Sequence, residues 1–249
     1  RAAVLLAKLG LDAFETRDAE DEALGQALAA LPAELEDEFL AAAEARQLSA
    51  QSRDVLRLVN EATARVRLSP IAALRERAPA LATANPPFVA GWELARQTRA
   101  GLGLNGGAVP QELLEELLAA SVTITEPGPS NASHEGACFV GKDGRVGAAL
   151  ARAQRPSSVR FATCRLLAES ILAPPGACSL ITRSESWRQR LNRAFAAEFL
   201  APSGFLAKAL PVSGGIVPPD AVEEVAEGLG VSSLLVQHQI ENHGIARVG

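Results

Sequence analysis

The chain has 249 residues, of which 48% are hydrophobic and 21% are charged, which is the composition of an ordinary globular protein. Its formal net charge of -5 argues against a general nucleic-acid-binding surface, because phosphate backbones attract basic proteins. No long apolar run is free of charge, which argues against a membrane span. Only 4% of the residues are aromatic, so we expect cores rich in leucine, alanine and valine.

The cysteine content indicates a reducing compartment. Cys138, Cys164 and Cys178 are widely spaced, odd in number and form no CxxC pair. We therefore expect neither a disulfide framework nor a cysteine zinc site. The first residues lack the order of a signal peptide, so we expect a cytoplasmic protein. Because the chain starts at Arg1 and contains no methionine, we also expect that a native segment before it is absent from this sequence.

Residues 1–86 are predicted to be a helical N-terminal region. Apolar residues recur there at helical spacing in three groups, and Pro32, Ser49 with Ser52, and Pro70 punctuate this pattern. The groups are Val4, Leu5, Leu9, Leu11 and Phe14; Leu24, Leu28, Leu31, Leu35, Phe39 and Leu40; and Val55, Leu56, Val59, Ala62 and Val66. We expect a small helical bundle. A DNA-reading helix-turn-helix is the alternative, but acidic residues stand where a recognition helix needs basic or amide side chains.

Pro86 and Pro87 mark the predicted domain boundary, and residues 87–249 are predicted to form the second domain. It opens with a helix from about Phe88 to Leu102, followed by a glycine-rich turn and a helix that begins near Pro110. The β-branched residues of Ser121–Thr125 predict a strand. After a polar loop, residues 137–140 and 146–150 flank an Asp-Gly turn, which predicts a β-hairpin.

The most informative segment runs from Arg160 to Pro202 and is predicted to contain two helices. The first should begin after Pro156 and end at Pro174. Its apolar face consists of Phe161, Cys164, Leu167, Ala168, Ile171 and Leu172. The second should follow Ser184. Its apolar residues are Trp187, Leu191, Ala194, Phe195, Phe199 and Leu200.

The C-terminal part is predicted to contain three more helices. A short amphipathic helix follows Pro202, and the next helix should be capped by Asp220 and end at Gly230. Ser232 should cap a last helix that ends at Gly244. The last two helices resemble a helix-turn-helix pair, but their acidic character disfavours DNA.

Arg160-Phe161, the aliphatic run after it, and the sequence AFAAEFLAP that ends at Pro202 resemble the core of the ImmA/IrrE family of zinc metallopeptidases. The resemblance covers roughly residues 88–243 and extends to the C-terminal sequence GVSSLLVQHQIEN. It implies an α+β, predominantly helical fold, in which an N-terminal helical bundle precedes a zincin-like domain with a small antiparallel sheet. The edge strand of such a sheet can hold an extended peptide by backbone pairing.

In that family the first helix carries HExxH, whose two histidines bind zinc while the glutamate polarises the bound water. The resemblance places Arg165 and Leu166 at the first histidine and the glutamate, and Glu169 at the second histidine. Arg165 has no lone pair to donate, Leu166 cannot accept a proton, and residues 187–193, where the third ligand is expected, contain no carboxylate. We therefore expect no catalytic residue and no zinc cofactor. Bound zinc would mean that the interpretation of a degenerate site is wrong.

The degenerate motif still leaves candidates for a binding groove, namely Arg160, Arg165, Glu169 and Glu198. Arg165 and Glu169 are four residues apart on the predicted helix, which suits an ion pair, either on the surface or in the former metal cleft.

His238 and His243 are weak metal candidates, because five positions on a helix separate two side chains by roughly 140°. His134, the third histidine, lies in a polar segment and is expected to be solvated.

The preferred hypothesis is a catalytically inactive ImmA/IrrE-like protein that acts as a regulatory binding module in stress, defence or transcriptional control. The family implies a protein partner, for which a helix-turn-helix regulator is the natural candidate, and direct nucleic-acid binding is not expected. The first alternative is a metal-dependent endopeptidase with a relocated site built from Glu169, Glu198, His134 or the C-terminal histidine pair. The second is a helix-turn-helix DNA-binding regulator. The oligomeric state stays open.

Overall fold

The computed structural model describes residue 25 and residues 29–44, 47–77, 86–118, 123–125, 133–151 and 155–249. The predicted helix through Val4 and Phe14, the positions of Leu24 and Leu28, and the first two residues of the strand predicted from Ser121 lie outside these residues.

The centre of the molecule is a five-stranded sheet. Strands β1 (Arg67–Leu68), β4 (Arg145–Ala151), β3 (His134–Val140) and β5 (Ala177–Thr182) lie in this order and pair antiparallel, and β2 (Thr123–Thr125) pairs parallel with β4. The predicted hairpin is confirmed, because β3 and β4 are joined by residues 141–144 with Gly144 at φ +80°.

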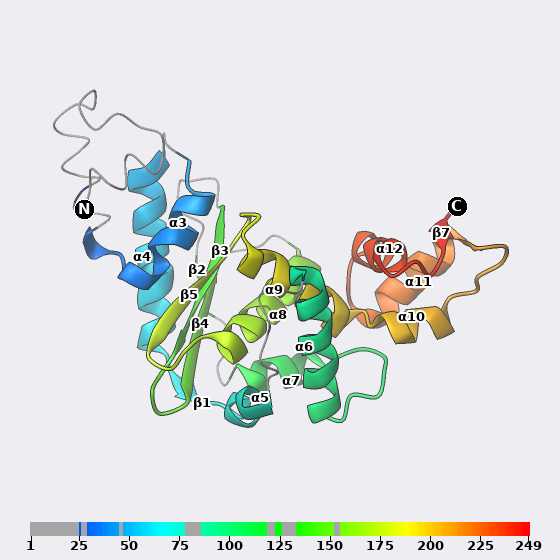
Figure 1. The fold of residues 1–249 in the computed structure, drawn as a ribbon, viewed down its shortest axis with the longest axis horizontal. Helices are drawn as coiled ribbons and strands as arrows, with labels where there is room; N and C mark the ends of the chain where they lie inside the picture. The colour runs from blue at the N-terminus through cyan, green and yellow to red at the C-terminus, as the bar shows by residue number, and fades with distance from the viewer. Residues whose placement is uncertain are drawn as a thin grey trace.

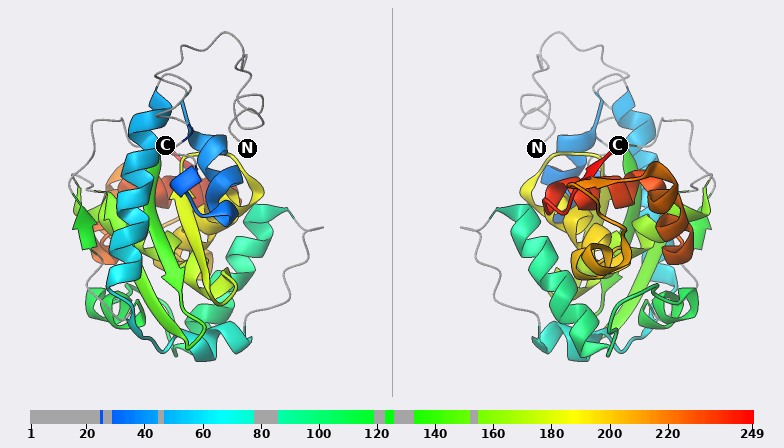
Figure 2. Two further views of the ribbon diagram at one scale, coloured as in Figure 1. Left: turned by 90° about the vertical axis from the view of Figure 1, so that its left-hand side faces the viewer. Right: turned by 90° about the vertical axis from the view of Figure 1, so that its right-hand side faces the viewer.

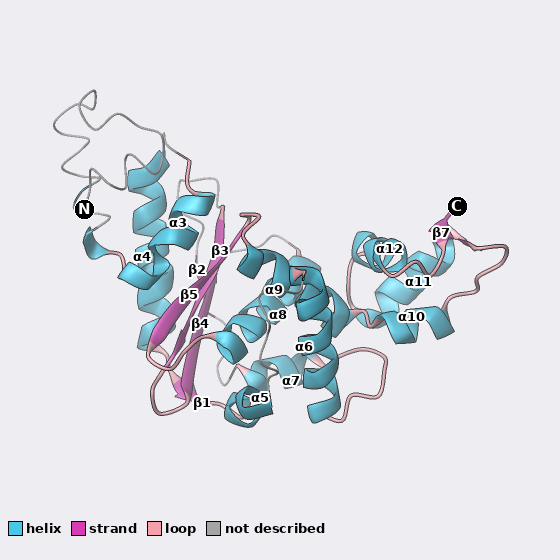
Figure 3. Cartoon of the chain, viewed as in Figure 1, coloured by secondary structure: helices cyan, strands magenta, loops and turns pink. Residues whose placement is uncertain are grey.

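Helices cover both faces of this sheet (Figures 1 and 3). On one face lie η1 (Ala33–Leu35), α3 (Glu36–Ala42) and α4 (Leu48–Ala64), and the left view of Figure 2 shows α4 running over the strands. On the other face lie α8 (Pro156–Leu172) and α9 (Trp187–Leu200), with α5 (Ile71–Arg77), α6 (Pro87–Gly101) and α7 (Gln111–Leu117) around them.

Successive side chains of the strands point alternately into two apolar cores, as a sheet covered on both faces requires. Ala137 and Leu180 pack with residues of η1, α3 and α4, whereas the neighbouring Cys138 and Ile181 pack with α8 and α9.

The described N-terminal helices therefore do not form a bundle of their own. Helix α4 and strand β1 belong to the same sheet assembly as residues 134–182, so the boundary expected at residues 86 and 87 does not separate two cores. Gly147 explains how closely α4 approaches: a Cβ at this position would lie 1.8 Å from the carbonyl oxygen of Ala62. The apolar face of α4 packs on the sheet, in a core that also includes residues of η1 and α3.

The helices of the second region begin and end close to the predicted residues. Pro87 and Pro156 stand in the first turns of α6 and α8, and α8 ends just before Pro174. Helix α9 begins two residues later than expected, because Ser186 rather than Ser184 caps it by accepting a hydrogen bond from the amide of Gln189.

The C-terminal residues form a smaller unit with an apolar core of its own. It consists of α10 (Ser203–Ala209), α11 (Pro219–Leu229) and α12 (Ser233–Asn242), with the short strands β6 (Ile216–Val217) and β7 (Arg247–Val248) paired in parallel. Gly230, at φ +66°, ends α11 and Ser232 caps α12, as predicted, whereas Asp220 lies in the first turn of α11 and Pro218 is its N-cap.

The α+β, predominantly helical class with a small, mainly antiparallel sheet is thus confirmed. None of the helices in the described ranges combines the length and the apolar character that a bilayer span requires.

Candidate functional site

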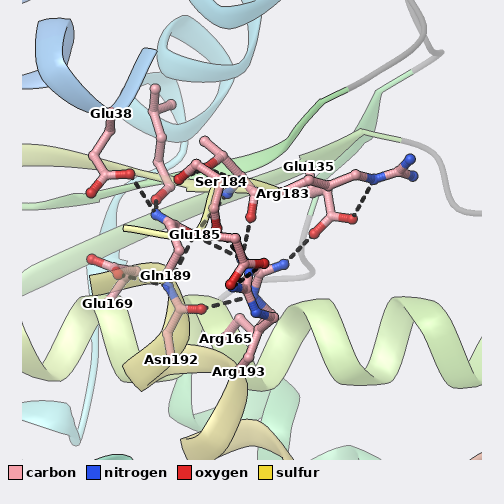
Figure 4. Close-up of polar contacts among 12 residues, drawn as sticks. Glu38, Glu135, Arg165, Glu169, Arg183, Ser184, Glu185, Gln189, Asn192 and Arg193 are labelled. Carbon is pink, nitrogen blue, oxygen red and sulfur yellow. Dashed lines mark hydrogen bonds and ion pairs between the residues drawn. The ribbon is translucent and has the colours of Figure 1, made fainter. Parts of the chain in front are cut away.

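Arg165 lies at the centre of a buried polar network between α8, α9 and the sheet (Figure 4). Only 3% of its surface is exposed. Its Nε donates to Asn192 Oδ1 at 2.8 Å, and its Nη2 donates to the carbonyl oxygen of Thr182 at 2.6 Å and to Gln189 Oε1 at 2.7 Å. Its Nη1 donates to the carboxylate of Glu135. Burial lowers the pKa of Arg165 and the negative charge of Glu135 opposes this shift, and a guanidinium remains cationic in a protein.

Glu169 lies one helical turn after Arg165 and is 1% exposed. Arg188 donates to it from Nε at 3.1 and 3.0 Å and lies 2.9 Å away through Nη2. Asn192 Nδ2 donates to its Oε1 at 2.9 Å. Burial disfavours the charged form of Arg188, but attraction and hydrogen bonds from Glu169 outweigh burial, so the pKa of Arg188 is raised.

The suggested Arg165–Glu169 ion pair is therefore replaced by two separate pairs. Arg165 binds Glu135 and Glu169 binds Arg188, while the amide of Asn192 bridges the two sites. Each of the two buried charges, the guanidinium of Arg165 and the carboxylate of Glu169, therefore has its own oppositely charged partner and additional hydrogen bonds.

Gln189 closes the network against the edge strand β5. Its Oε1 accepts from the amide of Thr182 at 2.9 Å and its Nε2 donates to the carbonyl of Leu180 at 2.8 Å. The side-chain amide therefore pairs with β5 as a peptide group of a neighbouring strand would. Its Nε2 also donates to Glu38 of α3 at 3.1 Å, and Glu38 accepts from Ser186 Oγ at 2.9 Å, so the network extends from α8 to α3.

The side chains at the motif-matched positions have the chemistry of a packed polar centre rather than of a metal site. Arg165 offers only donors, Leu166 is fully buried among apolar side chains, and the carboxylate of Glu169 is held by Arg188 and Asn192. Within the described ranges, no group of three or more histidine, cysteine or acidic residues is placed to hold a metal ion.

The four predicted groove residues lie at three different places. Arg165 and Glu169 share the network, whereas Arg160 donates to Gln111 Oε1 at 3.2 Å and to the carbonyl of Val109. Arg165, Glu169 and Glu198 are 3%, 1% and 1% exposed, so these three side chains are not positioned to line an open groove. The polar partners that bury them come from distant parts of the chain, which the sequence pattern did not indicate.

Glu198 is the centre of a second buried cluster, which joins α9 to the C-terminal unit. Its carboxylate accepts from Gln239 Nε2 at 2.9 Å and from Ser203 Oγ at 2.9 Å, and Arg96 Nε lies 3.2 Å from it. His243 Nε2 also lies 3.2 Å from Glu198. Burial lowers the pKa of His243, and Glu198 opposes this shift.

The three histidines do not come together. His134 is 3% exposed, so the expectation that it is solvated is wrong. Its ring stacks on Phe39 and its Nε2 donates to the carbonyl of Phe39 at 3.2 Å, and burial lowers its pKa to about 4. His238 is exposed on α12, whereas His243 contacts Trp92 and Glu198. The residues suggested for a relocated metal site are thus dispersed, except that Glu198 and His243 are neighbours.

The cysteine thiols have the pKa values of buried groups. Burial raises the pKa of Cys164 to about 12 and that of Cys178 to about 11, and it also raises the pKa of Cys138. These thiols remain protonated at neutral pH, so they are poor nucleophiles.

A pocket of about 470 Å³ lies between α6, α8, α9 and α12, and the sequence reasoning missed it. It is lined by Phe88, Trp92, Phe161, Arg193, Ala194, Ala197, Leu235, His238, Gln239 and Asn242. The sequence contains only eight phenylalanines and two tryptophans, and three of these ten aromatic residues line this pocket. Their shared location depends on how the helices pack, so the only signal in the sequence was the rarity of aromatic residues.

Comparison with known proteins identifies no family for the chain. No protein-family model matches it, and no curated protein matches it with significant similarity.

Proposed function

We propose that the chain is a catalytically inactive ImmA/IrrE-like protein, with a zincin-like arrangement of sheet, α8 and α9, that acts in the cytoplasm as a regulatory protein-binding module. One observation carries the inactive part of the proposal. The residues at the motif-matched positions are a buried cation, an apolar side chain and a carboxylate held by Arg188 and Asn192. A general base or a metal ligand needs an available lone pair, which this set does not offer.

The resemblance suggests a helix-turn-helix regulator as the partner, in stress, defence or transcriptional control. Addition of a partner strand to β5 is disfavoured between Leu180 and Thr182, because Gln189 already pairs with both residues. Exposed apolar side chains offer a better contact surface. Val89 on α6 and Leu234 on α12 are 36% and 58% exposed, and each is next in sequence to a residue that lines the pocket.

Metal content tests the inactive part of the proposal. Mass spectrometry of protein purified without chelator or affinity nickel should find substoichiometric zinc, unchanged in Glu169→Ala. A variant that combines Arg165→His, Leu166→Glu and Glu169→His with Gln189→Glu, which supplies a carboxylate within residues 187–193, should gain zinc toward one ion per chain, provided that circular dichroism shows it folded. One tightly held zinc in the unmodified chain, lost in Glu169→Ala, would contradict the proposal.

Partner binding is tested separately with a purified helix-turn-helix regulator. Calorimetry should detect binding that is weakened at least about tenfold in the double variant Val89→Ser/Leu234→Ser. The matched control is Val212→Ser/Ile216→Ser, which removes two apolar side chains that are 42% and 50% exposed elsewhere. Equal effects of the two double variants, or no binding to the regulator, would count against this surface and this partner.

The endopeptidase alternative has one observation in its favour, which is the contact between Glu198 and His243. It predicts peptide cleavage that chelators abolish and that His243→Gln removes. If the protein cleaves no peptide either with or without a chelator, the regulatory proposal stands.

A further inference from the structure

The aromatic pocket has the size and lining of a small-molecule site. Its volume of about 470 Å³ falls within the range of ligand pockets, and its walls combine aromatic rings with a few polar groups. We propose that it binds a small apolar organic anion, of the class of aromatic carboxylates. This proposal does not rest on the regulatory function, because it depends only on the residues around the pocket.

The aromatic wall is held in place before any ligand arrives. The ring of Trp92 lies 5.1 Å from that of Phe88, at 61°, and 4.0 Å from that of His243, at 40°. His243 in turn contacts the buried carboxylate of Glu198. A ring that already contacts two other rings loses little freedom when a ligand binds, which favours an aromatic ligand.

Two small side chains of α9, Ala194 and Ala197, line the pocket, and we call this part of the lining its floor. Helix α6 can approach this floor because Gly91 faces α9: a Cβ at Gly91 would lie 2.4 Å from the carbonyl oxygen of Leu191. The close approach brings Trp92, the next residue, beside the floor. The space above the two alanines is therefore bounded by helices that cannot collapse into it without repacking.

The charges around the pocket favour an anion over a cation. The chain has 29 acidic and 24 basic side chains, yet no aspartate or glutamate lines the pocket. Arg193 lines it, with Nη1 donating to the carbonyl of Ser184 and Nη2 to Glu185, each at 2.9 Å. Arg190 also donates to Glu185, at 3.0 Å, so these two guanidinium groups and the one exposed carboxylate together carry a net positive charge.

Isothermal calorimetry with three probes of one shape tests the proposal. Phenylpropionate, its neutral amide and the corresponding amine share the ring and the chain but differ in charge. We expect saturable binding with the carboxylate at least about fivefold tighter than the amide, and the amine weakest. Quenching of tryptophan fluorescence should accompany binding, since Trp92 lines the pocket.

Matched variants connect the binding to this pocket. Ala197→Leu fills the floor and should weaken the carboxylate at least about tenfold, whereas Ala209→Leu, on the exposed face of α10, should not. Arg193→Gln should abolish the preference for the carboxylate over the amide, and Arg190→Gln, which contacts the same Glu185 but does not line the pocket, should reduce it much less. Absence of saturable binding, equal affinity for the amine, or equal effects within either pair of variants would overturn the proposal. Such a result would not bear on the proposed regulatory function, which is tested by metal content and by regulator binding.

Discussion

Arg165 and Arg183 bind the same carboxylate, that of Glu135, in opposite environments. The side chain of Arg165 is 3% exposed and that of Arg183 is 71% exposed. Burial removes the water that would otherwise solvate a charge, so the partners of Arg165 must supply all of its stabilisation. The two arginines thus form an internal comparison of a buried and a surface ion pair.

We predict that Arg165→Met lowers the free energy of unfolding by about 3–5 kcal/mol, because it leaves Asn192 Oδ1 and the Thr182 carbonyl without this donor and removes one of the donors to Gln189. Arg165→Lys should cost less than Arg165→Met because it keeps the positive charge. It should not restore full stability, because an ammonium group cannot reproduce the planar set of donors of the guanidinium group. Urea unfolding measures both. Arg183→Ala is the control and should cost less than about 1 kcal/mol. A similar cost for Arg165→Met would mean that the network does not stabilise the fold.

His134 makes stability depend on pH. Its pKa falls from 6.5 to about 4 because burial disfavours the charged ring, so the folded state binds the proton more weakly than the unfolded chain. Its contribution is complete above pH 6.5 and is lost as the pH falls toward 4, by about 3 kcal/mol in total. We predict that His134→Phe, which keeps a ring against Phe39, flattens the decline in unfolding free energy between pH 7 and 4.5. An unchanged slope would contradict the burial of a neutral imidazole.

At the scale of single elements, glycine allows α4 to lie directly on the sheet. We predict that Gly147→Ala lowers the unfolding free energy by at least about 2 kcal/mol, because the new Cβ meets the Ala62 carbonyl oxygen, which is backbone and cannot move alone. Gly228→Ala in α11 is the control: nothing lies within 4 Å of its Cβ, and it should stabilise the helix by about 0.5 kcal/mol. Thermal unfolding of both variants measures the difference.

The edge strand β5 depends on a side chain from α9. We predict that Gln189→Met lowers the protection of the Thr182 amide against hydrogen exchange, because a thioether is a much weaker acceptor than the amide oxygen that it replaces. The Cys138 amide, in the central strand β3, should keep its protection. Exchange measured by NMR distinguishes the two, and retained protection at Thr182 would show that Gln189 is not needed to hold this edge.

The elements that the sequence predicted are those whose signals are local. The Asp143-Gly144 turn fixed the hairpin, and Pro87, Pro156 and Pro174 fixed helix ends, since each acts through its own backbone. Strand β5 was missed because its six residues, between two prominent helices, carry little periodicity. The burial of Arg165 was not predictable, because its partners lie 17 to 30 residues away and no local spacing indicates them.

At the scale of the whole molecule, Glu198 connects two apolar cores. It extends from α9, in the core that covers the sheet, and binds Ser203 and Gln239 of the C-terminal unit, whose core is separate. The carboxylate accepts hydrogen bonds from several donors at once, whereas an amide in the same position would turn its own donor group toward at least one of them. The attachment of the C-terminal unit therefore depends on the charge of one buried side chain.

We predict that Glu198→Gln lowers the unfolding free energy by about 2 kcal/mol and loosens the C-terminal unit first. Hydrogen exchange followed by mass spectrometry should show faster exchange in α11 and α12, while β3 is unchanged, because the donors of Gln239 and Ser203 lose a common acceptor. Glu241→Gln, on the exposed face of α12, is the control and should alter neither region. If Glu198→Gln speeds exchange equally in β3 and α12, the two cores unfold as one unit, and the carboxylate supports the whole fold rather than the attachment of its C-terminal part.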